Sequence, residues 1–249
     1  MCSSDLRFMN PHSVEPRAPG GTPGANAGGT PAPRRYVRTF PLRMTRIFLL
    51  SPASLNGLRA KMLTSPRAKF DLAAQYRSGD GVPIGDAFAF MSSLYFRGKI
   101  AYARRFAVPS PIVGGAGFFI ITSGYGLVPP EWRLNEERMK RMKKIDVDAS
   151  TRSYTRPLKE HAELLKKALE EDAEVVLLGS IATGKYVDVL RPILGPHLRF
   201  PKVFAGLGDM ARGGLMLRAA RAGKELEYTT LDAPRHRQPG TSGKMPALD

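Results

Sequence analysis

The sequence of 249 residues has one cysteine, Cys2, and four histidines, of which only His161 and His197 lie within residues 44–231. A single thiol forms no internal disulfide, and without a His/Cys cluster there is no zinc-binding pattern. No run approaches the roughly 18 apolar residues that a membrane-spanning helix needs. We therefore predict a cytoplasmic protein that folds without disulfides and holds no metal or other cofactor.

Acidic residues are also scarce. There are 22 Asp and Glu against 38 Lys and Arg, which gives a formal net charge of +16. Five cations crowd into Arg138–Lys144, and Arg97, Lys99, Arg104 and Arg105 are expected to decorate the end of a long helix. Such a charge attracts phosphate polymers, although basic residues in a last helical turn also complement the helix dipole. We expect a nucleic acid or nucleotide as partner and no membrane; the sequence does not determine the oligomeric state.

Composition divides the chain into three parts. Residues 1–43 contain five Gly and seven Pro without apolar periodicity, which predicts a disordered arm. We hypothesise that the functional protein begins at Met44, directly before the first predicted strand. Residues 44–231 are predicted to form one domain, and the polar residues 232–249 a flexible tail.

Short apolar runs alternate with amphipathic segments across residues 44–231. Strands are predicted at residues 46–51, 117–123, 174–179, 198–204 and 225–231, with Pro201 placing the fourth at an edge or a bulge. Helices are predicted over residues 84–105, after a cap at Asn135, from Thr155 with Pro157, and from a cap at Asp209 to about residue 221. This alternation predicts an α/β fold, a single layered domain with a mainly parallel sheet flanked by helices.

Hydroxyls and small residues follow three of the predicted strands. Ser51 follows the first, Ser123, Tyr125 and Gly126 follow the second, and Ser180 follows the third. The carboxyl ends of parallel strands meet at one edge, where open α/β sheets bind ligands. We therefore predict a binding edge at which Tyr125 stacks on a base or sugar and the small residues admit a phosphate. Turn formation alone selects the same residue types.

The turn after the third strand, Gly179–Lys185, fits the phosphate-binding pattern G-x-x-x-x-G-K between a strand and a helix. The next residue is Tyr186, where that pattern requires Ser or Thr to hold Mg²⁺. A phosphate contact by Lys185 is therefore favoured over nucleotide hydrolysis, and a degenerate P-loop NTPase is the weakest alternative.

A glycine-rich segment near the end of the domain carries further candidates. Gly213 and Gly214 lie in the first turns of a predicted helix, where each costs about 1 kcal/mol relative to Ala. A close approach of the backbone to a ligand or to another element would offset that cost. Arg212 is predicted to take phosphate, and Asp209 is interpreted as the helix cap. Glu131 and Asp209 are the candidates for a catalytic acid or base.

Taken in order, several segments resemble the YaaA-type peroxide-stress protein family. They are Phe48–Ala53, Ser93–Gly98, Thr122–Glu131, Val175–Tyr186 and Ala211–Met216, with a Tyr-Gly turn as the most recognisable part. The resemblance implies an α/β fold with a basic cleft, DNA binding and a role in limiting oxidative DNA damage, without a settled catalytic reaction. The first functional expectation is a nucleic-acid-associated protein; the alternative is an enzyme acting on a nucleotide, nucleoside or nucleobase at the same edge.

Overall fold

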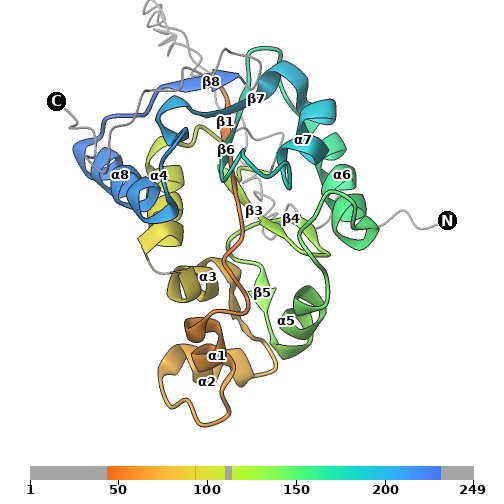
Figure 1. Cartoon of the computed structure of the whole chain (residues 1–249), viewed down its shortest axis with the longest axis vertical. Helices are drawn as coiled ribbons and strands as arrows, with labels where there is room; N and C mark the ends of the chain where they lie inside the picture. The colour runs from red at the N-terminus through yellow and green to blue at the C-terminus, as the bar shows by residue number, and fades with distance from the viewer. Residues whose placement is uncertain (1–43, 93, 110–113, 231–249) are drawn as a thin grey trace, which may run out of the picture. The chain divides into compact units, whose positions relative to one another are not determined.

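A computed structural model describes residues 44–92, 94–109 and 114–230. By its internal contacts the chain divides into two units, residues 1–43 and 44–249, and every described residue belongs to the second. The arm and the tail expected from composition lie outside the described residues. Within the described part, eight α-helices and a mixed, mostly parallel sheet of six strands form the predicted α/β fold (Figure 1).

The six-stranded sheet contains all five predicted strands. Its parallel strands are β1 (Arg46–Leu50), β3 (Phe118–Thr122), β6 (Glu174–Leu178) and β7 (Leu198–Pro201), and its antiparallel strands are β4 (Gly126–Val128) and β8 (Tyr228–Thr230). The strand order is β4-β3-β1-β6-β7-β8. A separate antiparallel pair joins β2 (Val82–Pro83) and β5 (Arg133–Leu134). The edge position expected from Pro201 is wrong, because β7 lies between β6 and β8; Pro201 is its last residue, where a missing N–H disturbs the ladder least.

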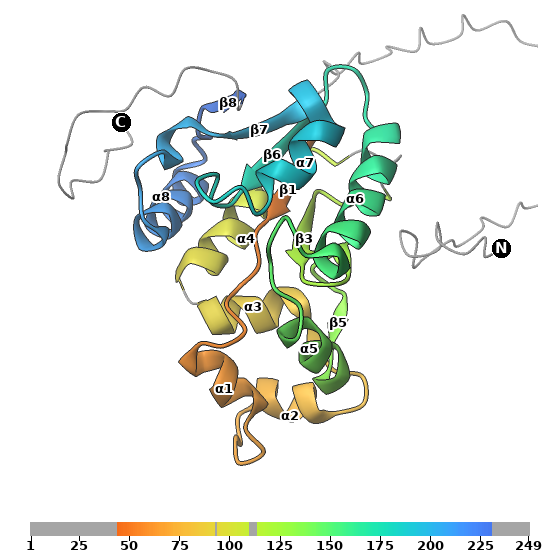
Figure 2. The ribbon, with the colours of Figure 1, turned by 45° about the vertical axis from the view of Figure 1, so that its right-hand side comes forward.

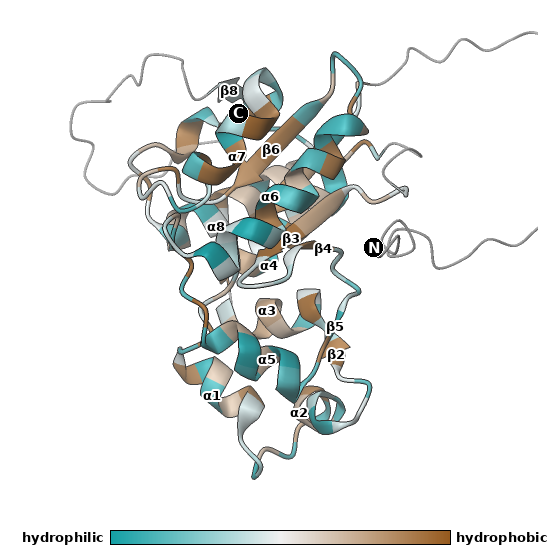
Figure 3. Ribbon diagram, turned by 90° about the vertical axis from the view of Figure 1, so that its right-hand side faces the viewer, coloured by the Kyte–Doolittle hydropathy of each residue, from teal (hydrophilic) through white to brown (hydrophobic). Residues whose placement is uncertain are grey.

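Helices cover both faces of the sheet. They are α1 (Leu58–Thr64), α2 (Asp71–Arg77), α3 (Ile84–Ser92), α4 (Leu94–Phe106), α5 (Glu136–Lys143), α6 (Arg152–Lys167), α7 (Val187–Leu194) and α8 (Asp209–Ala222), with short 3-10 turns at Gly195–His197 and Lys202–Phe204. Helices α4 and α8 lie on one face, and α6 and α7 lie on the other (Figures 1 and 2). Strands β1, β3 and β6 are buried along almost their whole length, and Figure 3 shows β3 and β6 as apolar ribbons behind the more polar α6.

Three helix boundaries differ from those predicted. The helix expected over residues 84–105 is two helices, because α3 packs on α1 and β2 whereas α4 packs on β1 and α8. Helix α6 begins at Arg152, one turn before the predicted Thr155, which buries Tyr154 completely. Asp209 is the first helical residue of α8 and not its cap; Gly208 holds the cap position. The cap predicted at Asn135 is confirmed, since its side chain accepts the Arg138 N–H at 3.0 Å.

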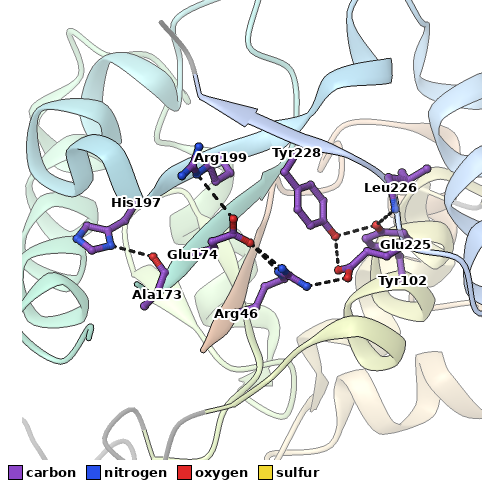
Figure 4. A network of polar contacts seen from close by, with 9 residues as sticks. All are labelled: Arg46, Tyr102, Ala173, Glu174, His197, Arg199, Glu225, Leu226 and Tyr228. Atoms are coloured by element: carbon purple, nitrogen blue, oxygen red, sulfur yellow. Dashed lines mark hydrogen bonds and ion pairs between the residues drawn. The ribbon is translucent and has the colours of Figure 1, made fainter. Parts of the chain in front are cut away.

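Polar contacts join the strands at the amino end of β1 (Figure 4). Arg46 forms ion pairs with Glu174 at 2.8 Å and with Glu225 at 2.7 Å. The Tyr228 hydroxyl donates to Glu225 at 2.6 Å and lies 2.7 Å from the Tyr102 hydroxyl. Burial lowers the pKa of Arg46, and the two carboxylates more than offset this effect. The network ties β1, β6 and the segment before β8 together, at the end of the sheet opposite the predicted binding edge.

Candidate functional site

The carboxyl ends of β1, β3 and β6 lie at one edge of the sheet because the three strands are parallel and in register, Leu50 pairing with both Ile120 and Leu178. From β1 the chain crosses to β3 on one side, and from β6 it crosses to β7 on the other. The winding therefore reverses between β1 and β6, which is the place where doubly wound α/β folds bind ligands. Ser51 and Gly179 are the first residues beyond these two strands.

Ser51 and Gly179 lie against each other between the ends of β1 and β6, where the winding reverses. A Cβ added to Gly179 would lie only 3.0 Å from the Ser51 Cβ, so the space between the ends of β1 and β6 holds the Ser51 side chain and no second one. Ser51 is 5% exposed. Its hydroxyl donates to the Leu178 carbonyl at 3.3 Å. Its lone pairs and its own carbonyl remain available as acceptors.

The Lys99 amine, on α4, donates hydrogen bonds to both the carbonyl oxygen and the hydroxyl of Ser51. Its Nζ lies 2.9 Å from the Ser51 carbonyl oxygen and 2.6 Å from the Ser51 Oγ, and 3.8 Å from the centre of the Tyr95 ring. The side chain is 1% exposed. Among the described residues no carboxylate forms an ion pair with it. Burial lowers the pKa of Lys99 to about 7; the negative charge of Asp209 opposes this shift and the positive charge of Arg212 adds to it.

Helices α4 and α8 cross at Gly98 and Gly213, and this crossing brings Lys99 close to Arg212. A Cβ on Gly98 would lie 2.6 Å from the Gly213 carbonyl oxygen, and one on Gly213 would lie 2.7 Å from the Cα of Tyr95. The close backbone approach expected from the glycines near the start of α8 is therefore present, with α4 as the partner. Because Lys99 follows Gly98 and Arg212 precedes Gly213, the crossing sets the two cations near each other.

Arg212 is held on the side of α8. Its Nη2 and Nε donate to the Phe204 carbonyl at 3.0 and 3.3 Å, and its side chain is 10% exposed. Asp209 lies 3.6 Å away, from Oδ1 to the Arg212 Nη1, with a side chain that is 68% exposed. The buried guanidinium lies near enough to Lys99 for its charge to lower the pKa of that amine, while the Asp209 carboxylate that partly balances it lies in solvent.

Two tyrosines complete the surroundings of Lys99. Tyr95 is 7% exposed, and its hydroxyl is buried without a hydrogen-bond partner in the described structure. Burial raises the pKa of Tyr95. Burial also raises the pKa of Tyr186 to about 12, with a smaller contribution from the charge of Tyr95. Both phenols are therefore protonated at neutral pH, and the Tyr95 hydroxyl lies near Arg212 and Ser51, which oppose the rise in its pKa, without completing a hydrogen bond to either. We call Ser51, Tyr95, Lys99, Tyr186 and Arg212 the Lys99 cluster.

Three other residues predicted for the binding edge, Ser123, Tyr125 and Gly126, contact neighbouring elements and lie outside the Lys99 cluster. The Ser123 hydroxyl is buried and donates to the Met142 carbonyl at 2.9 Å. Tyr125 packs its ring 4.9 Å from that of Trp132 and under the guanidinium of Arg141. Gly126 has φ +65°, and a Cβ there would lie 2.5 Å from a backbone oxygen of α6, so only glycine fits. These three residues pack the turn after β3 against α5 and α6.

The loop after β6 also differs from the predicted phosphate cradle. The Ser180 Oγ accepts the Ala182 N–H at 3.3 Å, an interaction within the turn, and Lys185 is exposed. The Asp188 carboxylate lies against Gly184, which puts negative charge where the pattern would need an anion. A surface depression of about 460 Å³ beside α7 is lined by Asp188 and its neighbours and contains none of the predicted site residues. Of the predicted acids and bases, Glu131 is exposed and Asp209 borders the Lys99 cluster.

Lys99, Tyr95 and Tyr186 were not among the residues predicted for the site. Lys99 was expected on the exposed face of its helix, which is wrong; Arg97, Arg104 and Arg105 are exposed there as expected. Its position, four residues after one buried Tyr and three before another, places it on the apolar stripe of α4. That spacing was readable in the sequence. The spacing could not reveal that Ser51 accepts the hydrogen bonds of the Lys99 amine.

Known proteins add nothing further to this geometry. No protein-family model, curated protein or solved structure matches the chain, so the resemblance to the YaaA-type family stays a prediction. Within the described residues, no group of three or more His, Cys, Asp or Glu side chains is placed to hold a metal ion. No helix in the same part of the chain is both long and apolar enough to cross a membrane.

Proposed function

We propose that the domain is an enzyme that acts on a nucleotide, a nucleoside or a nucleobase at the carboxyl edge of its sheet, with Lys99 exchanging protons with the substrate. The observation that carries the proposal is the burial of the Lys99 amine where the strand order reverses, with no carboxylate of the described residues paired to it. Burying a cation costs free energy that a purely structural side chain of similar length avoids. Groups shifted toward neutral pH in this way are concentrated at active sites.

The rest of the Lys99 cluster supports the class of substrate. Aromatic rings suit a base and a guanidinium suits a phosphate, and the cluster contains the rings of Tyr95 and Tyr186 and the charge of Arg212; the Lys99 amine lies over one face of the Tyr95 ring. Near pH 7 the Lys99 amine is divided between its two protonation states, so it can both take and return a proton. Ser51 orients the amine through its carbonyl and its hydroxyl.

A thermal-shift screen of the full chain with nucleobases, nucleosides and mononucleotides tests this proposal. A ligand at about 100 times its Kd stabilises the folded state by about 2.7 kcal/mol, which corresponds to a rise in Tm of roughly 5–10 °C. We expect the rise to persist in Lys185→Met and to disappear in Lys99→Met. A rise that is lost in Lys185→Met but kept in Lys99→Met would place the ligand at the loop after β6 and contradict the proposal, as would the absence of any rise.

Nucleic-acid binding is a second candidate function, favoured by a group of aromatic and basic side chains beside α5, in which the Tyr125 and Trp132 rings are tilted by 53°. The guanidinium of Arg138 lies 4.5 Å from the centre of the Trp132 ring, that of Arg141 lies 4.9 Å from the Tyr125 ring, and the two rings are 4.9 Å apart. Single-strand binding usually combines aromatic side chains, on which bases stack, with neighbouring cations.

Fluorescence anisotropy with a labelled single-stranded oligonucleotide tests the second candidate. The affinity should fall at least tenfold between about 50 mM and about 200 mM salt. It should also fall in the double variant Lys143→Glu/Lys144→Glu, at the exposed end of α5, and change less in the charge-matched double variant Lys159→Glu/Lys167→Glu, which reverses two exposed lysines of α6. Equal losses in the two variants would indicate attraction by net charge alone and would remove α5 as the interface.

A further inference from the structure

We propose that Lys99 forms an imine with the carbonyl carbon of its substrate, and that this substrate is an aldehyde or ketone carrying a phosphate or carboxylate group. The open-chain form of a pentose phosphate, the sugar part of a nucleotide, belongs to this class. The inference rests on the proposed function for the location of the substrate, at the Lys99 cluster. It adds a covalent step that the proposed function does not require.

The hydrogen bonds of Lys99 suit a neutral amine. The Nζ donates twice, to the carbonyl and the hydroxyl oxygen of Ser51, and a neutral amine has two hydrogens. The Ser51 hydroxyl donates its own hydrogen to the Leu178 carbonyl, so it does not occupy the nitrogen lone pair. Among the described residues no other donor bonds to this nitrogen. The lone pair therefore accepts no hydrogen bond from the described residues, and it can attack a carbon atom once a substrate reaches this side chain, which is 1% exposed.

The two groups that the carbonyl compound needs are beside the amine. The Tyr95 hydroxyl is buried and unpartnered, in the helical turn before Lys99, and can donate a hydrogen bond to the carbonyl oxygen. Arg212 approaches from α8 and can pair with the anionic group; the carboxylate with which it forms an ion pair, Asp209, is mostly in solvent. Tyr186 bounds the cluster at the start of α7. The site thus presents a nucleophile, a proton donor and a fixed positive charge.

The reaction balances without an oxidant or reductant. The lone pair of the Lys99 Nζ forms a bond to the carbonyl carbon, and the electron pair of the C=O bond moves to the oxygen, which takes a proton from the Tyr95 hydroxyl. The nitrogen then loses a proton, which restores the Tyr95 phenol, and the product is a carbinolamine. Loss of a second proton from nitrogen and of hydroxide from carbon, which leave together as water, gives the imine.

Reductive trapping tests the inference. The full chain is incubated near pH 7 with ribose 5-phosphate, glyoxylate or ribose, then reduced with borohydride, and the modified lysines are located by peptide mass spectrometry. At pH 7 an amine with a pKa near 7 is unprotonated about 10³ times more often than one with the ordinary lysine pKa. We expect modification of Lys99 at a rate at least about tenfold above that of Lys185, and faster with the two anionic carbonyl compounds than with ribose.

Two variants separate the roles in the cluster. Lys99→Arg should remove the rapid adduct, and Tyr95→Phe, which deletes only an unpartnered hydroxyl, should fold normally and trap roughly tenfold more slowly. Adducts spread over exposed lysines while Lys99 stays unmodified would overturn the inference. Trapping at Lys99 without stabilisation by any nucleotide, nucleoside or nucleobase would contradict the proposed function alone. Stabilisation that depends on Lys99 but without trapping would contradict the imine alone.

Discussion

Replacing Lys99 with methionine tests whether the buried amine loses its proton near neutral pH. Burial lowers the pKa of Lys99 from 10.5 to about 7 in the folded protein. Between these two pH values the unfolded chain binds a proton that the folded chain does not, so the free energy of unfolding rises with pH. Below pH 7 both states hold the proton, and the folded state bears the full cost of burying the charge, roughly 5 kcal/mol.

Urea unfolding of the full chain at several pH values from about 6 to about 9 measures this effect. Relative to Lys99→Met, the wild type should gain about 1.4 kcal/mol of unfolding free energy per pH unit above pH 7 and little below it. The substitution also removes two hydrogen bonds to Ser51, a cost of about 1–3 kcal/mol that does not change with pH. The change with pH of the difference in unfolding free energy therefore reports the protonation of Lys99, whereas the constant part of that difference does not.

Lys185→Met is the matched control, because this lysine is exposed and lies at the same edge of the sheet. Its unfolding free energy should follow the wild type at every pH. A constant difference between wild type and Lys99→Met from about pH 6 to about pH 9 would mean that the amine keeps its proton. That result would refute proton exchange by Lys99 near neutral pH, whatever the screen for ligands finds.

Two further substitutions test the packing that positions the site. Gly98→Ala places a Cβ 2.6 Å from the Gly213 carbonyl oxygen and should cost about 1–3 kcal/mol in urea unfolding, whereas Gly79→Ala, with open space around it, should cost far less. Equal costs would mean that the helix crossing is loose. Arg46→Met leaves the partly buried Glu225 without its cation and leaves Glu174 with only the longer contact to Arg199 at 3.9 Å, and it should cost about 2 kcal/mol after solvent screening. Arg156→Met removes only an exposed pair, and a loss as large as that from Arg46→Met would contradict the structural role of the Arg46 network.

The fold class was predictable because its signals are local. The runs that form β1, β3 and β6 are apolar on both faces, which occurs when helices cover both sides of a parallel sheet. The cap at Asn135 was equally local. The break between α3 and α4 was not, because each half follows a different packing partner although the apolar spacing continues across both.

The candidate site was predictable only in part. Ser51 was found because the turn after a buried strand is a local feature, and Arg212 because it lies near the start of a predicted helix, where an anion is favoured. Tyr125 and Lys185 carry the right functional groups at the predicted edge, but Tyr125 packs against Trp132 and Lys185 lies in solvent. Local sequence places a residue at the end of a strand, but it does not determine which neighbouring residues the side chain packs against.

By itself, the sequence determined the alternation of strands and helices and the edge at which three strands end, since hydrophobic periodicity and turn chemistry act over a few residues. Only the tertiary structure decided that Lys99 is part of the candidate site. Its amine meets Ser51 because α4 packs along β1 with Lys99 beside the carboxyl end of the strand, and it nears Arg212 because α4 and α8 cross at two glycines far apart in the chain. The protonation of such a group depends on its burial and on the charges around it, and both arise from contacts between distant segments.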